Sequence, residues 1–188
     1  MKPASQQPEV TALLARAREG DAQALGTAYA AVYDELKRAA RAQLRRSHDR
    51  FQTTALVHEA YLKLAGGSRL TATDRNHLLA LSARAMRQVL VDDARARKAD
   101  KRGSGLEALT LTAGGVESGE RAVFEVLALD ELLQSLHKAD ERAAQIVELR
   151  YFGGYSEAEI AQMLGISDRT LRRDWRKARA FLLAEMPA

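Results

Sequence analysis

The stretch that decides the fold is YSEAEIAQMLGISDRTLRRDWRKARAFL, residues 155–182. Ser156 and Glu159 have the S-x-x-E spacing of a capping box, in which two side chains satisfy free backbone N–H groups at a helix start. The buried side of the short helix that follows is formed by Ile160, Ala161 and Leu164. Gly165 then permits a tight left-handed turn, and Ser167 is placed to cap a second helix. This pattern predicts a helix-turn-helix.

The second helix of the pair has two opposed faces at 100° per residue. The apolar face consists of Leu171, Trp175, Ala178 and Leu182. The opposite face consists of Arg169, Arg172, Arg173 and Arg176. A separated basic stripe on this helix suits a DNA major groove, where arginine pairs with guanine edges or grips phosphates. The alternative, a solvated basic face on a structural helix, is less favoured because capping box, turn glycine and stripe coincide.

The rest of the chain shows helical periodicity, and no stretch alternates convincingly like a strand, so we predict an all-α fold. We expect five helices in the first half and up to four in the second. The first runs from about Val10 to Arg18, and Asp21 caps a long helix that reaches about Arg46. A third helix ends at Gly66-Gly67, and another runs from Thr73 or Asp74 to about Arg102.

A composition break separates the halves. The segment GSGLEALTLTAGGVESGE, residues 103–120, holds five of the twelve glycines and has no sustained apolar period. We interpret it as a flexible linker between two helical domains, residues 10–102 and 121–186; a long surface loop within one domain is the alternative.

Composition excludes several classes of protein. The 188-residue chain has 46% hydrophobic and 29% charged residues, so it is globular, and it lacks cysteine, which excludes disulfides and thiolate metal sites. The four histidines are scattered. No catalytic pair, metal cluster or phosphate-binding glycine loop is visible, so we predict neither an enzyme nor a cofactor. No apolar run would span a membrane and the N-terminus has no signal-peptide core, so we expect a cytoplasmic protein.

A second basic stripe lies on the long helix of the first half. Its members fall within roughly 80° of one another on an ideal helix: Arg84, Arg87, Arg95, Lys98 and Arg102. Between positions 84 and 102 there are seven basic residues and three acidic ones. The stripe suits a surface that follows a nucleic-acid backbone, although a solvated face is a serious competitor.

The segment FQTTALVHEAYLKL, residues 51–64, is an amphipathic helix whose start carries no acidic residue. Helix starts usually attract negative charge, because the free N–H groups and the macrodipole favour it.

Together these stretches resemble the extracytoplasmic-function (ECF) group of the sigma-70 family, which keeps only the region 2 and region 4 domains. ALVHEAYLKL (55–64) looks like the polymerase-binding helix, usually written with L-V-Q-E. LSARAMRQVLVDDARARKADKR (81–102) resembles the helix that handles the −10 element. ELRYFGGYSEAEIAQMLGISDRTLRRDWRKARAFL (148–182) resembles region 4, and its RTLRRDWRKAR is close to the T-V-K-R-D-W pattern of one subgroup.

The resemblance implies a factor that binds core RNA polymerase and directs it to promoter DNA. It implies −35 contacts by Ser167, Arg169, Thr170, Arg172, Arg173 and Arg176. For the −10 element it implies the basic stripe together with Asn76 and His77, from TATDRNH (71–77), as liners of a pocket for an unstacked base. It implies contacts of Leu56, Val57 and Glu59 with a basic coiled coil of the largest polymerase subunit, with a solvated Glu59 as the alternative. The apolar residues of this helix are expected in the core, with Leu56 or Val57 shared with the interface: Leu56, Val57, Tyr61 and Leu62.

In most ECF factors the polymerase-binding helix opens with acids, often D-A-E-D, where this chain has residues 52–55, Gln-Thr-Thr-Ala. We hypothesise that a Ser/Thr kinase phosphorylates Thr54 or Thr53 and so creates the missing charge. Two alternatives stay open: a threonine that is only an N-cap, and a helix that binds polymerase well enough unmodified.

Rival functions are a helix-turn-helix regulator that acts without polymerase, and an inactive sigma-like adaptor. An anti-sigma partner and an autoinhibited form, with the domains folded on each other, also remain open.

Overall fold

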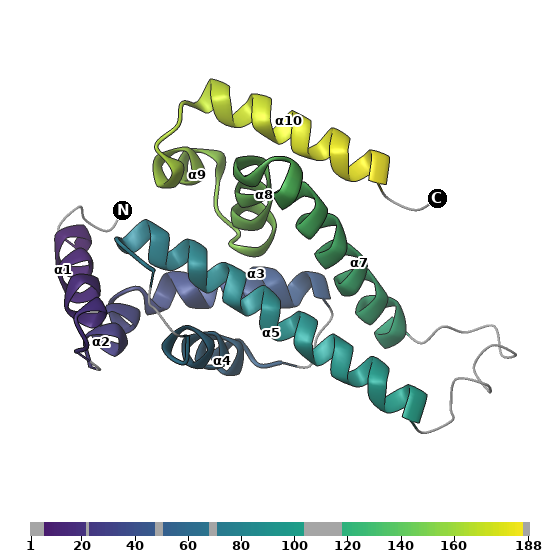
Figure 1. Ribbon diagram of the computed structural model, residues 1–188, viewed down its shortest axis with the longest axis horizontal. Helices are drawn as coiled ribbons and strands as arrows, with labels where there is room; N and C mark the ends of the chain where they lie inside the picture. Colours follow the sequence, from purple (N-terminus) through teal and green to yellow (C-terminus); the bar gives the residue numbers. More distant parts are fainter. Residues whose placement is uncertain (1–5, 22, 48–50, 68–70, 104–117, 186–188) are drawn as a thin grey trace, which may run out of the picture.

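The computed structural model describes residues 6–21, 23–47, 51–67, 71–103 and 118–185 (Figure 1). Over these residues every regular element is helical, which confirms the all-α prediction. The first half comprises α1 (Gln6–Arg18), α2 (Ala24–Ala31), α3 (Tyr33–Ser47), α4 (Thr53–Ala65) and α5 (Arg75–Gly103). The second comprises α7 (Ser118–Ala139), α8 (Glu141–Val147), the π-helical turn η1 (Glu148–Phe152), α9 (Glu157–Leu164) and α10 (Asp168–Glu185).

The predicted long helix from Asp21 to Arg46 is wrong, because the chain breaks at Val32 into α2 and α3. Val32 leaves helical geometry, with φ −111° and ψ 15°, and its side chain is fully buried. The break lets α2 and α3 each turn an apolar face toward one core. The Asp21 carboxylate accepts the N–H groups of Gln23 and Ala24 at 3.0 and 3.2 Å, but Gln23 occupies the N-cap position of α2, so Asp21 is not the predicted N-cap.

The core of the first half forms where α1 to α4 pack on α5. Leu14, Leu36, Leu56, Leu78 and Met86 are all fully buried there. A smaller core joins α7, α8 and α10 through Leu133, Leu136, Ala144, Val147 and Ala178. Each half therefore contributes buried apolar residues of its own.

The predicted linker 103–120 is shorter in the structure, because α5 includes Gly103 and α7 begins at Ser118. Both helices extend past their predicted limits, and residues 104–117 lie outside the described part of the chain.

The two halves lie against each other. In Figure 1, α7 runs beside α5, and α8 and α9 sit above α3. The larger apolar cluster continues from the first half into Leu149, Tyr155, Ile160 and Leu171 of the second. The two halves are thus closed against each other. The sequence did not decide between this arrangement and two separated domains.

Candidate nucleic-acid and polymerase interfaces

The helix-turn-helix has the predicted local geometry. Ser156 and Glu159 form a complete capping box at the start of α9. Gly165 ends α9 in the left-handed region at φ 63°. The N–H of Thr170 donates to the Ser167 hydroxyl at 3.2 Å, so Ser167 caps α10. The capping box, the left-handed glycine and the cap of α10 therefore all lie at the positions predicted from local sequence.

The two predicted faces of α10 are confirmed. Leu171 and Ala178 are fully buried, and Trp175 shares their face and is half-buried. The guanidinium of Arg150 lies 4.3 Å from the centre of the Trp175 ring. On the opposite face the four arginines are exposed: Arg169, Arg172, Arg173 and Arg176.

Two acidic residues, Glu157 and Asp174, lie beside the arginines of this face. Arg150 and Arg172 approach the Glu157 carboxylate at 2.7 and 3.4 Å. The hydrogen bond from Arg150 is the main reason that the pKa of Glu157 lies below its usual value. Exposed pairs of this kind contribute about 0–1 kcal/mol, so a DNA phosphate can readily replace Glu157 beside Arg172.

Asp174 is a structural residue that the sequence reasoning missed. Its side chain is buried under α10 and accepts hydrogen bonds from Arg142 and Arg173 at 2.7 and 3.1 Å. Burial opposes its ionisation, but the two arginines outweigh this and lower its pKa. The sequence feature that could have identified Asp174 is an acidic residue within a run of arginines on one helix.

The predicted −10 pocket residues lie at the start of α5. Asp74 caps the helix by accepting the N–H of His77 at 3.0 Å. Asn76, His77 and Arg84 line a pocket of about 330 Å³. The opposite wall comes from the second half, with Glu148, Met163 and Leu164 among its residues. The structure thus brings the three predicted residues together, beneath a wall that the sequence did not reveal.

The basic stripe of α5 is divided by burial. Arg84, Arg95 and Lys98 are exposed, whereas Arg87 is buried against the second half. In this closed arrangement Arg87 is not accessible to DNA. The side chain of Arg102 lies outside the described side chains.

The helix α4 begins at Thr53, and Gln52 occupies its N-cap position without a side-chain cap bond. The alternative that Thr53 or Thr54 is only the N-cap is therefore wrong, since both lie within the first turn. Thr54 is exposed and Thr53 half-buried, and the first turn holds no acidic residue.

The residues of α4 that were predicted to contact polymerase differ in their exposure. Leu56 and Val57 are 0% and 2% exposed, which confirms their expected place in the core, and their burial makes them unavailable for the predicted polymerase contact. Glu59 is exposed, as a contact residue must be. Leu62, which the sequence reasoning assigned to the core, is 48% exposed and adds an apolar side chain to this surface.

A helix-turn-helix together with a second basic helix is typical of the class of DNA-binding proteins. A family model described as ECF sigma factor matches residues 7–188, and the chain therefore belongs to the ECF sigma factor family. Its members are alternative sigma factors of transcription initiation, so core RNA polymerase and promoter DNA are its partners. None of the curated proteins matches the chain significantly. Across the described residues, no helix combines the length and the apolar character that crossing a membrane requires.

Proposed function

We propose that this sigma factor binds core polymerase tightly only after phosphorylation of the start of α4, at Thr54 in preference to Thr53. The observation that carries the proposal is the open first turn of α4, which exposes a threonine hydroxyl where the family pattern has an acid. In register, Thr54 stands at the glutamate of D-A-E-D.

The local geometry favours a phosphate. The first backbone bond of α4 runs from the N–H of Leu56 to the carbonyl of Gln52, so three N–H groups precede the helical ladder. Such groups and the helix macrodipole favour an anion. A phosphothreonine there would carry about −1.5 to −2 charge and three acceptor oxygens, which suit arginines of a partner.

The size of the effect follows from charge-assisted hydrogen bonds, which contribute about 1.5–3 kcal/mol each. We expect phosphorylation to tighten binding to core polymerase about 10- to 150-fold for one such bond. Glu59 and Leu62 on the exposed side of α4 would supply contacts common to both forms.

The DNA contacts complete the proposed function. The exposed arginines of α10, with Ser167 and Thr170, would read the −35 element. Asn76, His77 and the α5 stripe would hold the −10 strand once the second half moves away. A helix-turn-helix regulator that acts without polymerase is disfavoured, because the family match extends over both halves.

The test is the affinity for core polymerase of the unmodified chain and of the chain carrying phosphothreonine at position 54. Tight binding by the phosphorylated form alone is expected, and Thr54→Glu with Ala55→Asp should imitate it without a kinase. Thr54→Ala should prevent activation.

The matched control is Thr27→Ala, which removes another exposed threonine, on α2, and should change nothing. Equal affinity of the modified and unmodified chains would leave the sigma function intact and overturn the phosphorylation switch.

A further inference from the structure

Arg87 lies midway along α5 and is held by three side chains of the second half. It donates to Asp130 of α7, and it donates to Glu148 of η1 at 2.6 Å. Its guanidinium also lies 5.7 Å from the centre of the Phe152 ring. Arg87 and Asp130 are 8% and 6% exposed, so this pair is almost completely removed from water.

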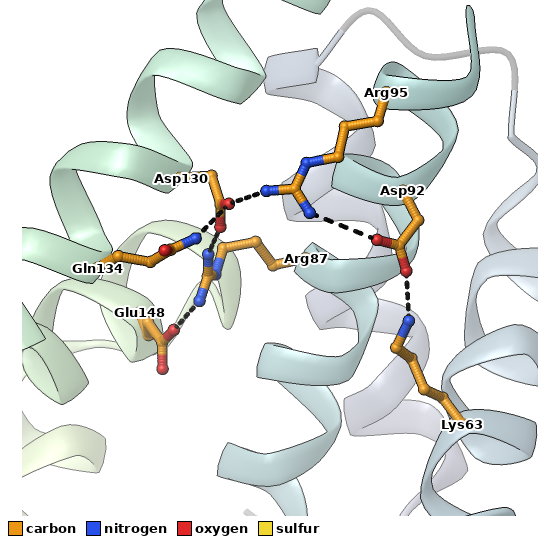
Figure 2. Close-up of polar contacts among 7 residues, drawn as sticks. All are labelled: Lys63, Arg87, Asp92, Arg95, Asp130, Gln134 and Glu148. Atoms are coloured by element: carbon orange, nitrogen blue, oxygen red, sulfur yellow. Dashed lines mark hydrogen bonds and ion pairs between the residues drawn. The ribbon is translucent and has the colours of Figure 1, made fainter. Parts of the chain in front are cut away.

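Figure 2 shows that Asp130 is the centre of a larger network. Its carboxylate also accepts from Arg95 at 3.1 Å and from Gln134 at 2.8 Å. Arg95 in turn lies 3.8 Å from Asp92, which pairs with Lys63 of α4. Two carboxylates of the second half therefore occupy two arginines of the stripe predicted to follow DNA. We call Arg87, Arg95, Asp130 and Glu148 the clasp.

Charge distribution along the chain agrees with this pairing. Residues 1–103 contain 19 basic and 11 acidic residues, a net +8, whereas residues 104–188 contain 10 basic and 14 acidic residues, a net −4. The acidic half thus lies against the basic one, as a nucleic-acid backbone would.

The physical character of the clasp suits a contact that opens. A buried ion pair gains little net free energy, because separation returns both charges to water. The Nε of Arg87 is buried with no hydrogen-bond partner among the described residues, so opening would satisfy it. At the edge of the contact, Arg38 and Glu159 form only an exposed pair at 3.5 Å.

The same contact covers the predicted base pocket. Glu148 belongs both to the clasp and to the pocket wall opposite Asn76 and His77. A single movement of the second half would therefore release Arg87 and uncover the pocket.

We propose that the clasp is an autoinhibitory contact, in which Asp130 and Glu148 stand in for DNA phosphates on α5 and keep the −10 surface closed in the free protein. The proposal rests on the proposed function, because it assumes that α5 binds the promoter strand. Opening would be driven by core polymerase or by DNA that competes for the same arginines.

The experiment uses the full chain and needs no polymerase. The protein lacks cysteine, so Ala30→Cys on α2 and Ala180→Cys on α10, both exposed, accept a donor and an acceptor dye. Energy transfer between them reports closure, and a fluorescent single-stranded oligonucleotide reports DNA binding.

Asp130→Asn with Glu148→Gln removes the clasp carboxylates at nearly constant shape. Glu131→Gln with Glu141→Gln is the matched control, since it changes the net charge equally at exposed positions.

We expect the clasp variant to lose energy transfer and to bind the oligonucleotide about tenfold more tightly if the open form is about a tenth of the wild-type population. The control should keep the energy transfer of the wild type. A second opener avoids the charges: Ala42 is buried where a side chain at Gly154 would approach its Cβ to 2.9 Å, so Ala42→Leu should wedge the halves apart. Circular dichroism would verify that both variants remain helical.

Unchanged energy transfer and DNA affinity in both openers would overturn the clasp, as would opening without a gain in DNA binding. Neither result depends on Thr54 or on polymerase, so failure of the clasp is distinguishable from failure of the phosphorylation switch. That switch is tested separately by polymerase binding.

Discussion

Two helices of this protein, α5 and α10, each carry a stripe of basic residues but have different surroundings. On α10 the four arginines face away from the core, and their described acidic neighbours Glu157 and Asp174 belong to the same half. On α5 part of the stripe meets the other half: Arg95 pairs with Asp130, and Arg87 is buried by carboxylates more than 40 residues away along the chain. Helical periodicity therefore predicts where a basic stripe lies, whereas tertiary packing decides whether the stripe is open to solvent.

The largest expected effect comes from Arg87→Ala, because it leaves the Asp130 and Glu148 carboxylates without their principal cation. Breaking a buried pair in this way costs about 3–5 kcal/mol, which should shift the closed arrangement to the open one. Energy transfer in the dye-labelled chain measures the shift. Arg84→Ala, at an exposed position of the same stripe, is the control. Equal opening by both variants would show that the buried pairing of Arg87 does not hold the halves together.

Asp174→Asn should have the next largest effect, about 1–2 kcal/mol of the free energy of unfolding, within the second half alone. The pKa of Asp174 is lowered, so its ionised form contributes stability above the pKa of the unfolded chain, near 4, and loses it as the pH falls through the lower folded value. Urea denaturation from pH 3 to 7 should show the variant approaching the wild type at the acidic end. A constant difference across this range would contradict the assignment.

Two glycines with a left-handed backbone conformation test the same comparison through smaller changes in stability. Gly154 has φ 68° and Gly165 has φ 63°, so alanine should cost about 1 kcal/mol or slightly more at either position. An alanine Cβ at Gly154 would also approach Ala42 of α3 to 2.9 Å, whereas the space around Gly165 is open. Gly154→Ala should therefore reduce energy transfer and Gly165→Ala should not. Thermal unfolding would measure the shared cost.

The smallest effect on stability is expected for Arg169→Ala, within about 0.5 kcal/mol, because the side chain is exposed on α10. Its loss should instead weaken binding to a −35 duplex by about 1–3 kcal/mol if it pairs with a base edge. Fluorescence anisotropy of the holoenzyme on labelled duplex would measure this. A large loss of stability would show that α10 is not the open stripe described above.

The sequence predicted features that depend on neighbours along the chain. The capping box at Ser156, the turn at Gly165 and the buried face around Leu171 follow from spacing alone. The break at Val32 could not be predicted, because it depends on how α2 and α3 share one core. The burial of Arg87 could not be predicted either, because Asp130 and Glu148 come from distant segments of the chain.

The candidate sites divide in the same way. Residues on outward faces, such as Glu59 and the arginines of α10, lie where periodicity placed them. Leu56 and Val57 are buried, because an amphipathic helix turns its strongest apolar positions toward the core. Whether a residue on a helix face meets solvent or another helix is a tertiary property, which one helix's periodicity does not contain.

The covalent connection between α5 and α7 has a consequence for how the closed form responds to its surroundings. Fourteen residues, 104–117, join the two helices. A short tether keeps joined surfaces at an effective concentration of about millimolar, so even a contact that would be weak between separate molecules stays largely formed. Because this concentration is intramolecular, dilution or overproduction of the protein leaves the closed fraction unchanged. The clasp should therefore respond to the supply of competing polymerase and DNA, and be indifferent to the abundance of the sigma factor itself.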